Sequence, residues 1–242
     1  MRIVFSRKGF DQGSGGTFSP IVDGRPISLP IPTKHRSPTT YEDLGLGDIV
    51  TEITSGKIGK DHRCHEDPMF SDNRCAFGQT GAAQSHLANQ SVGVGDVFLF
   101  FGLFSDGSYG GKHHRIFGYL KVSEVVALGV RSGMQGIPGF TRQHPHFVGE
   151  WNPNNTLYIG EGAVACRATD GLRLTAPGNR PSVWRVPPWL RETGLTYHSN
   201  DERWKEDGLL EVAARGQEFV THVGNNGSAR TWLNQIIQGI RQ

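Results

Sequence analysis

Two apolar runs joined by a glycine-rich loop restrict the possible folds more than any other part of the sequence. Residues 97–103 (VFLFFGL) are apolar throughout, and residues 114–122 (HRIFGYLKV) form a second β-prone run. Residues 105–111 between them are rich in glycine and serine, which is typical of a hairpin with a long tip. Gly118 in the second run favours a sheet that curls tightly. We therefore predict a strongly curved strand pair in the middle of the chain.

The rest of the chain predicts short elements around this pair. The 33 glycines and 13 prolines among 242 residues imply many turns and few long helices. We predict a single α+β domain over residues 1–242, with flanking short helices and long loops. The other predicted elements are strands at 2–5, 156–159 and 164–168, a hairpin across 20–32, and helices at 81–88, 207–215 and 229–240.

The composition excludes several classes of protein. With 25 basic and 23 acidic side chains the formal net charge is +2, which argues against a disordered tail, a coiled coil and a strongly basic nucleic-acid coat. An anionic partner must therefore meet a local basic patch. The three cysteines indicate no disulfide framework, and no apolar run is typical of a signal peptide or a membrane span. We expect a cytoplasmic protein with no membrane partner.

The central strand pair resembles a known hairpin. The residues GDVFLFF at 95–101, followed by RIFGYLKV at 115–122, are similar to the hairpin of PUA-like barrels. That superfamily includes the ASCH, EVE and YTH modules, which bind RNA or modified bases. The resemblance implies that the core, at about residues 93–170, is a small mixed β-barrel of the PUA-like kind, and it implies a ligand of that class.

Phrases along nearly the whole chain resemble the third family of nucleotide modification associated domains. They include SRKGFDQGSGG at 6–16, CHEDP at 64–68, FGQTGAAQSHL at 77–87, HPHF at 144–147 and ARGQEFV at 214–220. The family is tied to phage and bacterial systems that modify or process nucleotide bases. The resemblance implies a nucleotide or nucleic acid as a partner, including one with a modified base, and partner enzymes of a modification system. It implies no particular reaction and no particular cofactor.

The densest cluster of titratable residues is the segment 62–67. Within it, His65, Glu66 and Asp67 are the candidate catalytic acid and base groups, because a carboxylate near an imidazole sets its tautomer and raises its basicity. The alternative is a solvated loop. Four residues in and near this segment nominally offer zinc ligands, but their spacing fits no standard zinc motif, so we predict no metal site. These four residues are His62, Cys64, His65 and Cys75.

Two cations beside a glycine-rich turn form the candidate phosphate site. Arg7 and Lys8 follow the predicted first strand, and Gly15 and Gly16 lie in the turn that comes next. Backbone N–H groups of such a turn can point at a phosphate while the two side chains supply charge. The alternative is a tight turn with solvated charges.

Further candidates for binding a nucleotide or nucleic acid carry amide, cationic or aromatic groups. Glutamine reads a base edge with two hydrogen bonds, cations meet phosphates, and aromatic rings stack on flipped bases. For each residue the alternative is an ordinary role at the surface or in the core. These candidates are Gln79, Gln84, Lys112, His113, His114, His144, His146, Trp151, Tyr158, Arg215 and Gln217.

The sequence supports more than one hypothesis for the function. The first is a protein associated with nucleotide or base modification that holds a nucleotide or a modified base in a cleft of the PUA-like barrel. The alternative is an enzyme, a transferase or hydrolase, that acts on a nucleotide or base through His65, Glu66 and Asp67. A third interpretation is a structural subunit of a modification complex.

Overall fold

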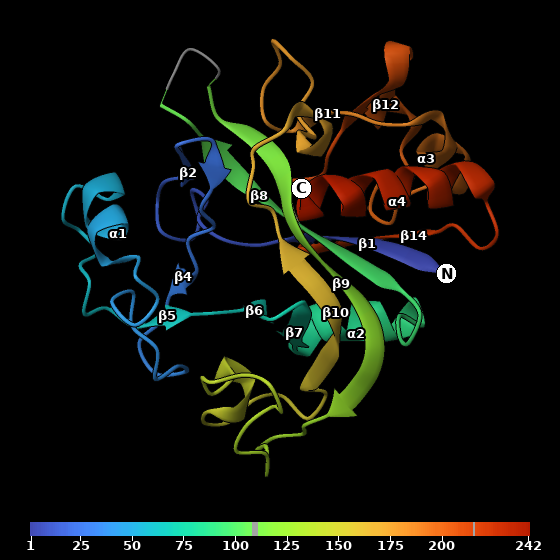
Figure 1. The fold of residues 1–242 in the computed structure, drawn as a ribbon. Helices are drawn as coiled ribbons and strands as arrows, with labels where there is room; N and C mark the ends of the chain where they lie inside the picture. The colour runs from blue at the N-terminus through green and yellow to red at the C-terminus, as the bar shows by residue number, and fades with distance from the viewer. Residues whose placement is uncertain (108–110, 215) are drawn as a thin grey trace.

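The computed structural model describes residues 1–107, 111–214 and 216–242 (Figure 1). Its mixture of helices and strands confirms the predicted α+β class. The strands are β1 (Arg2–Arg7), β2 (Ser19–Val22), β3 (Arg25–Pro26), β4 (Ile31–Pro32), β5 (Cys64–His65), β6 (Met69–Ser71), β7 (Arg74–Gln79), β8 (Val97–Ser105), β9 (His113–Ala127), β10 (Thr156–Val164), β11 (Val183–Arg185), β12 (Trp204–Lys205), β13 (Leu209–Glu211) and β14 (Glu218–His222). The helices are α1 (Gly47–Ile53), α2 (Gly81–Asn89), α3 (Pro188–Thr193) and α4 (Gly227–Arg241), with 3-10 turns η1 (Pro145–Phe147), η2 (Asp170–Leu172), η3 (Asp201–Arg203) and η4 (Glu206–Gly208).

One large mixed sheet organises the molecule. Within the described residues it has nine strands, in the order β14-β1-β8-β9-β10-β7-β6, with β2 beside the far end of β8 and β3 beside β2. Strand β1 runs parallel to β8, and the following pairs along the order are antiparallel. The sheet therefore takes strands from both ends of the chain as well as from its middle.

The predicted central hairpin is confirmed as β8 and β9. Phe100 lies opposite Gly118, but Phe101 lies opposite Ile116, so one extra residue forms a bulge in β9. A Cβ atom at Gly118 would lie 2.8 Å from the ring of Phe70, which allows only glycine there without a shift. A bulge and a glycine at the same place bend a sheet strongly.

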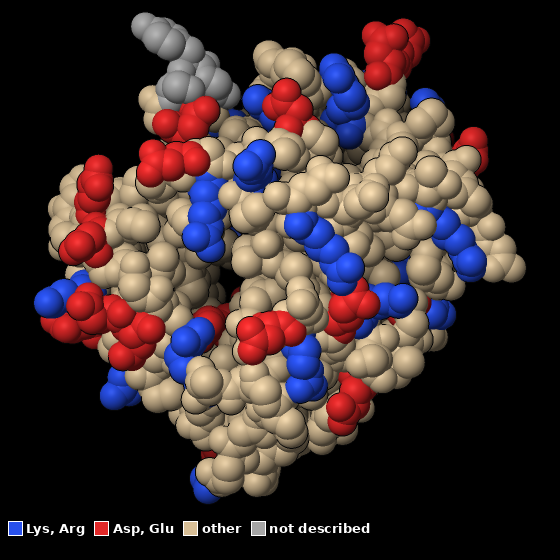
Figure 2. All heavy atoms as spheres, viewed as in Figure 1, with Lys and Arg blue, Asp and Glu red and all other residues tan. Residues whose placement is uncertain are grey.

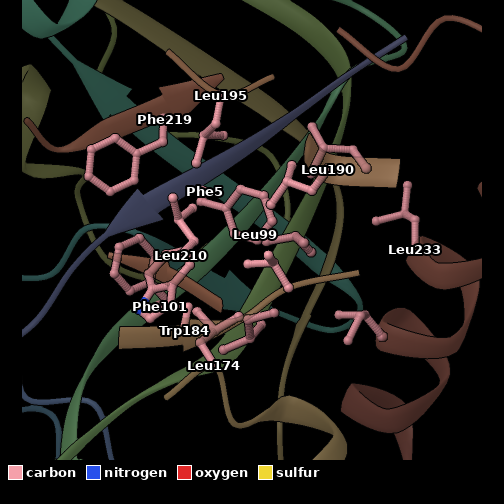
Figure 3. Close-up of a cluster of buried hydrophobic side chains, with 14 of the residues drawn as sticks. Phe5, Leu99, Phe101, Leu174, Trp184, Leu190, Leu195, Leu210, Phe219 and Leu233 are labelled. Carbon is pink, nitrogen blue, oxygen red and sulfur yellow. The ribbon is translucent and has the colours of Figure 1, made fainter. Parts of the chain in front are cut away.

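Strand β8 carries apolar side chains on both of its faces, and both faces are buried. Leu99 and Phe101 face an outer core that they share with Trp184, the three-stranded sheet β11-β13-β12, and helices α3 and α4 (Figure 3). Phe98 and Phe100 face an inner core that the curl of the large sheet encloses. Full burial of each large apolar side chain stabilises the fold by about 1.5–3 kcal/mol.

Helix α4 covers the outer core, as the periodicity of residues 229–240 predicts. Leu233, Ile236 and Ile240 recur at helical spacing and are buried at 4 %, 5 % and 1 % exposure. Asn226 caps the helix by accepting a hydrogen bond from the N–H of Ala229.

The two ends of the large sheet approach each other through side chains. Val4 of β1 and Val220 of β14 share the inner core with Phe77 of β7. Nε2 of Gln79, at the end of β7, donates a 2.8 Å hydrogen bond to Glu218 at the start of β14. No backbone pairing joins these ends within the described residues, so the sheet is an open cup and the predicted closed barrel is absent. We call the gap between β7 and β14 the seam.

Two predicted elements are wrong. The helix predicted at 207–215 is replaced by η4 and strand β13, because Asp207 has a positive φ of 61° and the buried Leu210 and Val212 alternate with a more exposed residue. The strand predicted at 164–168 does not form, since β10 is one continuous strand that ends at Val164.

A small N-terminal lobe carries α1 and has a core of its own. Phe10, Leu29, Tyr41, Val50 and Cys64 form this core. Figure 1 shows the lobe on the side of the molecule opposite α3 and α4. Among the described residues, no helix has the length and apolarity needed to cross a membrane.

Candidate functional site

A cavity of about 330 Å³ lies where the N-terminal lobe meets the seam. Its walls come from the ends of β1 and β7, the segment just before β14, the segment around β5, and η1 with the loop that follows it. We call it the seam cavity. Sequence-distant candidates therefore meet at one place, among them Arg7, Lys8, His65, Asp67, Gln79, His146, Trp151 and Gln217.

A second hollow opens on another side of the same region. It lies between the lobe that carries α1 and strands β9 and β10, and Figure 2 shows it as a deep recess in the surface. Lys8, Gly9 and Asp67 line both this hollow and the seam cavity. Asp67 therefore stands in the wall between the two spaces.

Glu66 and Asp67 directly follow β5, and the three candidate acid and base groups are separated along this segment. Side chains alternate along an extended chain, so His65 and Asp67 share one side and Glu66 takes the other. His65 and Asp67 line the seam cavity. Glu66 lines the second hollow, where Nε and Nη2 of Arg142 donate to its two carboxylate oxygens at 2.7 and 2.6 Å. Glu66 is thus held in an ion pair away from the other two groups.

One backbone N–H group and three imidazole rings surround the carboxylate of Asp67. Its Oδ1 accepts a 3.0 Å hydrogen bond from the N–H of Gly78 and lies 3.4 Å from Nε2 of His144. Its Oδ2 lies 3.6 Å from Nε2 of His65 and 3.5 Å from Nε2 of His146. Burial alone raises the pKa of Asp67, but the imidazoles of His144 and His65 outweigh it and hold that pKa well below its usual range. The carboxylate is therefore ionised at neutral pH.

His146 is fixed in position and in tautomer. Its Nδ1 faces the carbonyl oxygen of Asn155, and the amide nitrogen of Asn155 donates to the backbone oxygen of His146. Nδ1 must therefore carry the proton, which leaves Nε2 with a lone pair. Burial lowers the pKa of His146 to about 4, so the ring is neutral at pH 7. A Cβ atom at Gly78 would lie 2.4 Å from this ring, so only glycine admits it here.

Three side chains of the cavity wall are arranged so that they can hold a metal ion. Ligand atoms of His65, Asp67 and His146 all lie within 4.8 Å of one another. The other set considered from the sequence does not assemble, since Cys64 belongs to the core of the lobe and Cys75 to the inner core. Burial also raises the pKa of Cys75 well above its usual value, which disfavours the thiolate.

The two candidate cations stand at the end of β1. Arg7 donates from Nη1 and Nη2 to the backbone oxygens of Ala214 and Ala213, at 3.0 and 3.2 Å. Nζ of Lys8 lies 3.0 Å from Oε1 of Glu218 and 4.3 Å from the centre of the Phe77 ring. Arg7 is therefore positioned by the segment just before β14, and Lys8 by β14 and, across the seam, by Phe77 of β7.

Four of the predicted binding residues do not line the seam cavity. Gly15 packs against the ring of Phe10 inside the glycine-rich turn, while Gly9, Asp11 and Ser14 are the residues of this segment at the cavity. Tyr158 is 1 % exposed in the inner core and donates a 3.1 Å hydrogen bond to Gln84. A base cannot stack on a ring buried in this way. The candidates found elsewhere are Gly15, Gly16, Gln84 and Tyr158.

The basic mouth of the central hairpin is also separate from the seam cavity. Lys112 is exposed, with its Nζ 5.1 Å from the centre of the Phe18 ring, and His113 lines a different hollow beside Arg115. His114 accepts a 3.0 Å hydrogen bond from Nε1 of Trp184. His144 lies behind the cavity wall, next to Asp67, and Arg215 lies outside the described residues.

Two side chains that shape the site are not among the predicted site residues. Glu218 is 1 % exposed and accepts hydrogen bonds from Lys8 and Gln79. A lone carboxylate at the start of the apolar run FVTHV is the signal that would have pointed to a buried partner. Asn155 orients His146, and nothing in the sequence distinguishes it from an ordinary turn residue.

The fold and cavity define a curled α+β protein with a polar cavity at an open sheet seam. A model of the family described as nucleotide modification associated domain 3 matches residues 2–222. The chain belongs to that family, which confirms the resemblance found in the sequence and associates the protein with nucleotide modification. Comparison with curated proteins and with solved structures gave no significant match.

Proposed function

We propose that this protein binds a nucleotide in the seam cavity. The observation that carries the proposal is that sequence-distant segments bring cations, imidazoles, a carboxylate and amides to one cavity of about 330 Å³. Ligand pockets typically have volumes of about 300–1,000 Å³. In this proposal the curled sheet is a PUA-like core, and its open seam is the cleft. Membership of the family supports a nucleotide or a modified base as the ligand.

The phosphate end of the nucleotide is assigned to Arg7 and Lys8. The guanidinium group of Arg7 is held in place by two backbone oxygens, and its Nε is buried without an acceptor among the described residues. The positive charges of Arg7 and Lys8 at the cavity wall would attract a phosphate, and charge-assisted hydrogen bonds to phosphate are among the strong ones.

The base end is assigned to amide groups instead of a stacking ring. Trp151 stacks on His146 at 4.2 Å between ring centres, and the guanidinium of Arg36 lies 4.4 Å from the Trp151 ring. The ring of Trp151 is therefore already in contact with an imidazole and a guanidinium group. Gln217 lines the cavity, and its side-chain amide makes no hydrogen bond within the described part of the chain. It is free to read a base edge.

Binding measurements on three variants test this proposal. We would titrate the protein with mononucleotides, single-stranded DNA and RNA, and duplex DNA, with and without modified bases, by calorimetry at low salt. Arg7→Gln should weaken binding by about tenfold or more, because it removes a charged donor. Gln217→Ala should change the preference among bases. Lys112→Gln is the control and should bind like the parent protein, since Lys112 lies outside the cavity. The proposal would be refuted if none of these ligands bound, or if Arg7→Gln and Lys112→Gln lost the same amount of affinity.

A second candidate function is an enzyme that acts on the bound nucleotide. The observation that favours it is that His65 and Asp67 face the same cavity as the proposed phosphate site. Glu66 has no part in this version, because Arg142 occupies its carboxylate. Incubation with nucleotides and analysis of products by mass spectrometry tests it. Turnover that is lost in His65→Gln but kept in His62→Gln would support an enzyme.

A further inference from the structure

Three bare ligand atoms converge on one point in the wall of the seam cavity. Nε2 of His65 and Nε2 of His146 lie 3.6 and 3.5 Å from the same oxygen, Oδ2 of Asp67. A metal ion holds nitrogen and oxygen ligands at about 2.0–2.2 Å, which places neighbouring ligand atoms about 3.0–3.5 Å apart. The two separations from Oδ2 are close to this, and all three ligand atoms lie within 4.8 Å of one another, so coordination requires the two imidazoles to move only slightly closer together.

The hydrogen bonds around His146 leave its Nε2 as the ring nitrogen that is available to bind a cation. Because Nδ1 carries the proton that faces Asn155, Nε2 of His146 points at Asp67 as an acceptor. The carboxylate oxygen opposite is an acceptor as well. Two buried acceptors that face each other are stable only when a proton or a metal ion lies between them. His65 brings a third group that can ligate a metal ion to the same oxygen.

The other carboxylate oxygen of Asp67, Oδ1, has neighbours of the kind that surround metal-binding carboxylates in proteins. Oδ1 accepts from the N–H of Gly78 and faces Nε2 of His144. Nδ1 of His144 accepts from the N–H of His146, so the proton of His144 is on Nε2, which lies 3.4 Å from Oδ1 of Asp67. Such outer contacts orient the ligands of metal sites and fix their tautomers. Here they turn Oδ2 and both Nε2 atoms toward the cavity.

We infer that the seam cavity holds a divalent first-row transition-metal ion, ligated by His65, Asp67 and His146. Two imidazoles and one carboxylate form a ligand set that suits zinc and non-haem iron(II). Three protein ligands leave coordination positions open, and these positions face the cavity, where a water molecule or a ligand oxygen completes the set. This inference depends on the ligand geometry alone and stands with or without a nucleotide in the cavity.

Metal titration of the full chain, without nucleotide, tests the inference. The protein would first be treated with a chelator and dialysed, then titrated with Zn²⁺, Co²⁺ and, under nitrogen, Fe²⁺. We expect one ion per chain, a Kd of about 10 µM or tighter for Zn²⁺, and weaker binding of Co²⁺ and Fe²⁺ in the usual order of stability. Bound Co²⁺ should give visible absorption bands of a site with nitrogen and oxygen ligands, and bound Zn²⁺ should raise the Tm.

Variants of each ligand connect the ion to this place. His65→Gln, Asp67→Asn and His146→Gln should each weaken Zn²⁺ binding by about 100-fold or more, beyond the effect expected for an outer partner. His65→Gln is the decisive variant, because the His65 side chain is 17 % exposed and its loss leaves the core intact. Its Tm without metal should match that of the parent protein.

The control is His62→Gln, in the same loop. His62 is exposed and its Nδ1 faces the backbone of Gly59, so its replacement should leave metal binding unchanged. The inference is overturned if the parent protein binds none of the three ions below about 100 µM, or if His65→Gln keeps the parent affinity. Since no nucleotide is present, neither result bears on the proposed nucleotide site.

Discussion

Nε2 of His146 and Oδ2 of Asp67 face each other at 3.5 Å, and both side chains are nearly fully buried. This contact joins η1 to the segment that enters β6, and it forms beside β7 because Gly78 has no side chain. The segment before β6 and strand β7 belong to one hairpin, whereas η1 lies far along the chain. The geometry of the site therefore depends on a glycine that carries no chemistry of its own.

Gly78→Ala should disturb the site more than the fold. Its Cβ atom would lie 2.4 Å from the ring of His146, so the ring must move. We expect a loss of about 1–3 kcal/mol in the free energy of unfolding, as for other overpacked sites. Metal affinity should fall by about tenfold or more, because His146 leaves its ligating position. Urea unfolding and Co²⁺ titration measure the two effects.

The matched control for this change is Gly133→Ala. A Cβ atom at Gly133 meets nothing within 4 Å and its φ is not positive, so both measurements should stay at the parent values. Parent-like metal binding by Gly78→Ala would contradict the assigned role of His146.

Lys8→Met should destabilise the protein because it leaves Glu218 without its cation. Glu218 is 1 % exposed, and breaking a buried pair of this kind costs about 3 kcal/mol or more. Adding Glu218→Gln should restore about 1 kcal/mol or more, because the uncompensated charge is then gone. Chemical unfolding of the two single variants and the double variant gives the coupling energy. Arg180→Met breaks the exposed pair with Glu211 and should cost about 1 kcal/mol or less; an equal loss in Lys8→Met would be inconsistent with a buried pair.

Local sequence patterns predicted the strands and helices in which buried apolar residues recur at a regular spacing or in an unbroken run. The strand at 2–5, the hairpin of 97–103 with 114–122, and the helix at 229–240 have regular apolar spacing, and all are present. The open seam was not predictable in this way. It depends on contacts such as that between Gln79 and Glu218, which are 139 positions apart and make no local pattern.

In the candidate site, too, local sequence predicted some features and long-range contacts determined the others. Polar phrases in the sequence marked Arg7, His65 and Asp67, and these residues do line one cavity. Treating the segment around His65 as an extended strand would have placed Glu66 on the opposite side, so this separation was accessible from the sequence. The tautomer of His146 depends on a side chain nine positions away, and sequence alone gives no sign of that contact.

Stability should fall as the pH drops below about 6.5, the ordinary pKa of histidine. Burial, with the charges of Arg7 and His113, lowers the pKa of His114 to about 3. Between these values the unfolded chain binds a proton that the folded chain does not, so protons favour unfolding. One such group removes about 3 kcal/mol between pH 7 and pH 4. Urea unfolding at several pH values measures this slope.

The variant that isolates His114 is His114→Asn, which keeps an acceptor near the position of Nδ1 for the indole N–H of Trp184. It should flatten the pH dependence by close to one proton. His35→Asn, at an exposed position, should leave the slope as it is. If both variants keep the parent slope, His114 is not a source of the acid sensitivity.

Metal and nucleotide binding should strengthen each other. Among the described residues of the seam cavity, the cations Arg7 and Lys8 are balanced by the carboxylates Asp11 and Asp67, so the cavity alone offers a phosphate little net positive charge. A divalent ion at Asp67 reverses that balance and presents open coordination positions to a phosphate oxygen. We expect a mononucleotide to bind about tenfold or more tightly to the Zn²⁺-loaded protein than to the chelated protein, with the same factor for Zn²⁺ when nucleotide is saturating, because coupling between two sites is reciprocal. Calorimetric titrations in both directions measure the factor. Equal nucleotide affinity with and without metal would separate the two sites energetically and leave Arg7 and Lys8 as the sole source of charge for the phosphate among the described residues.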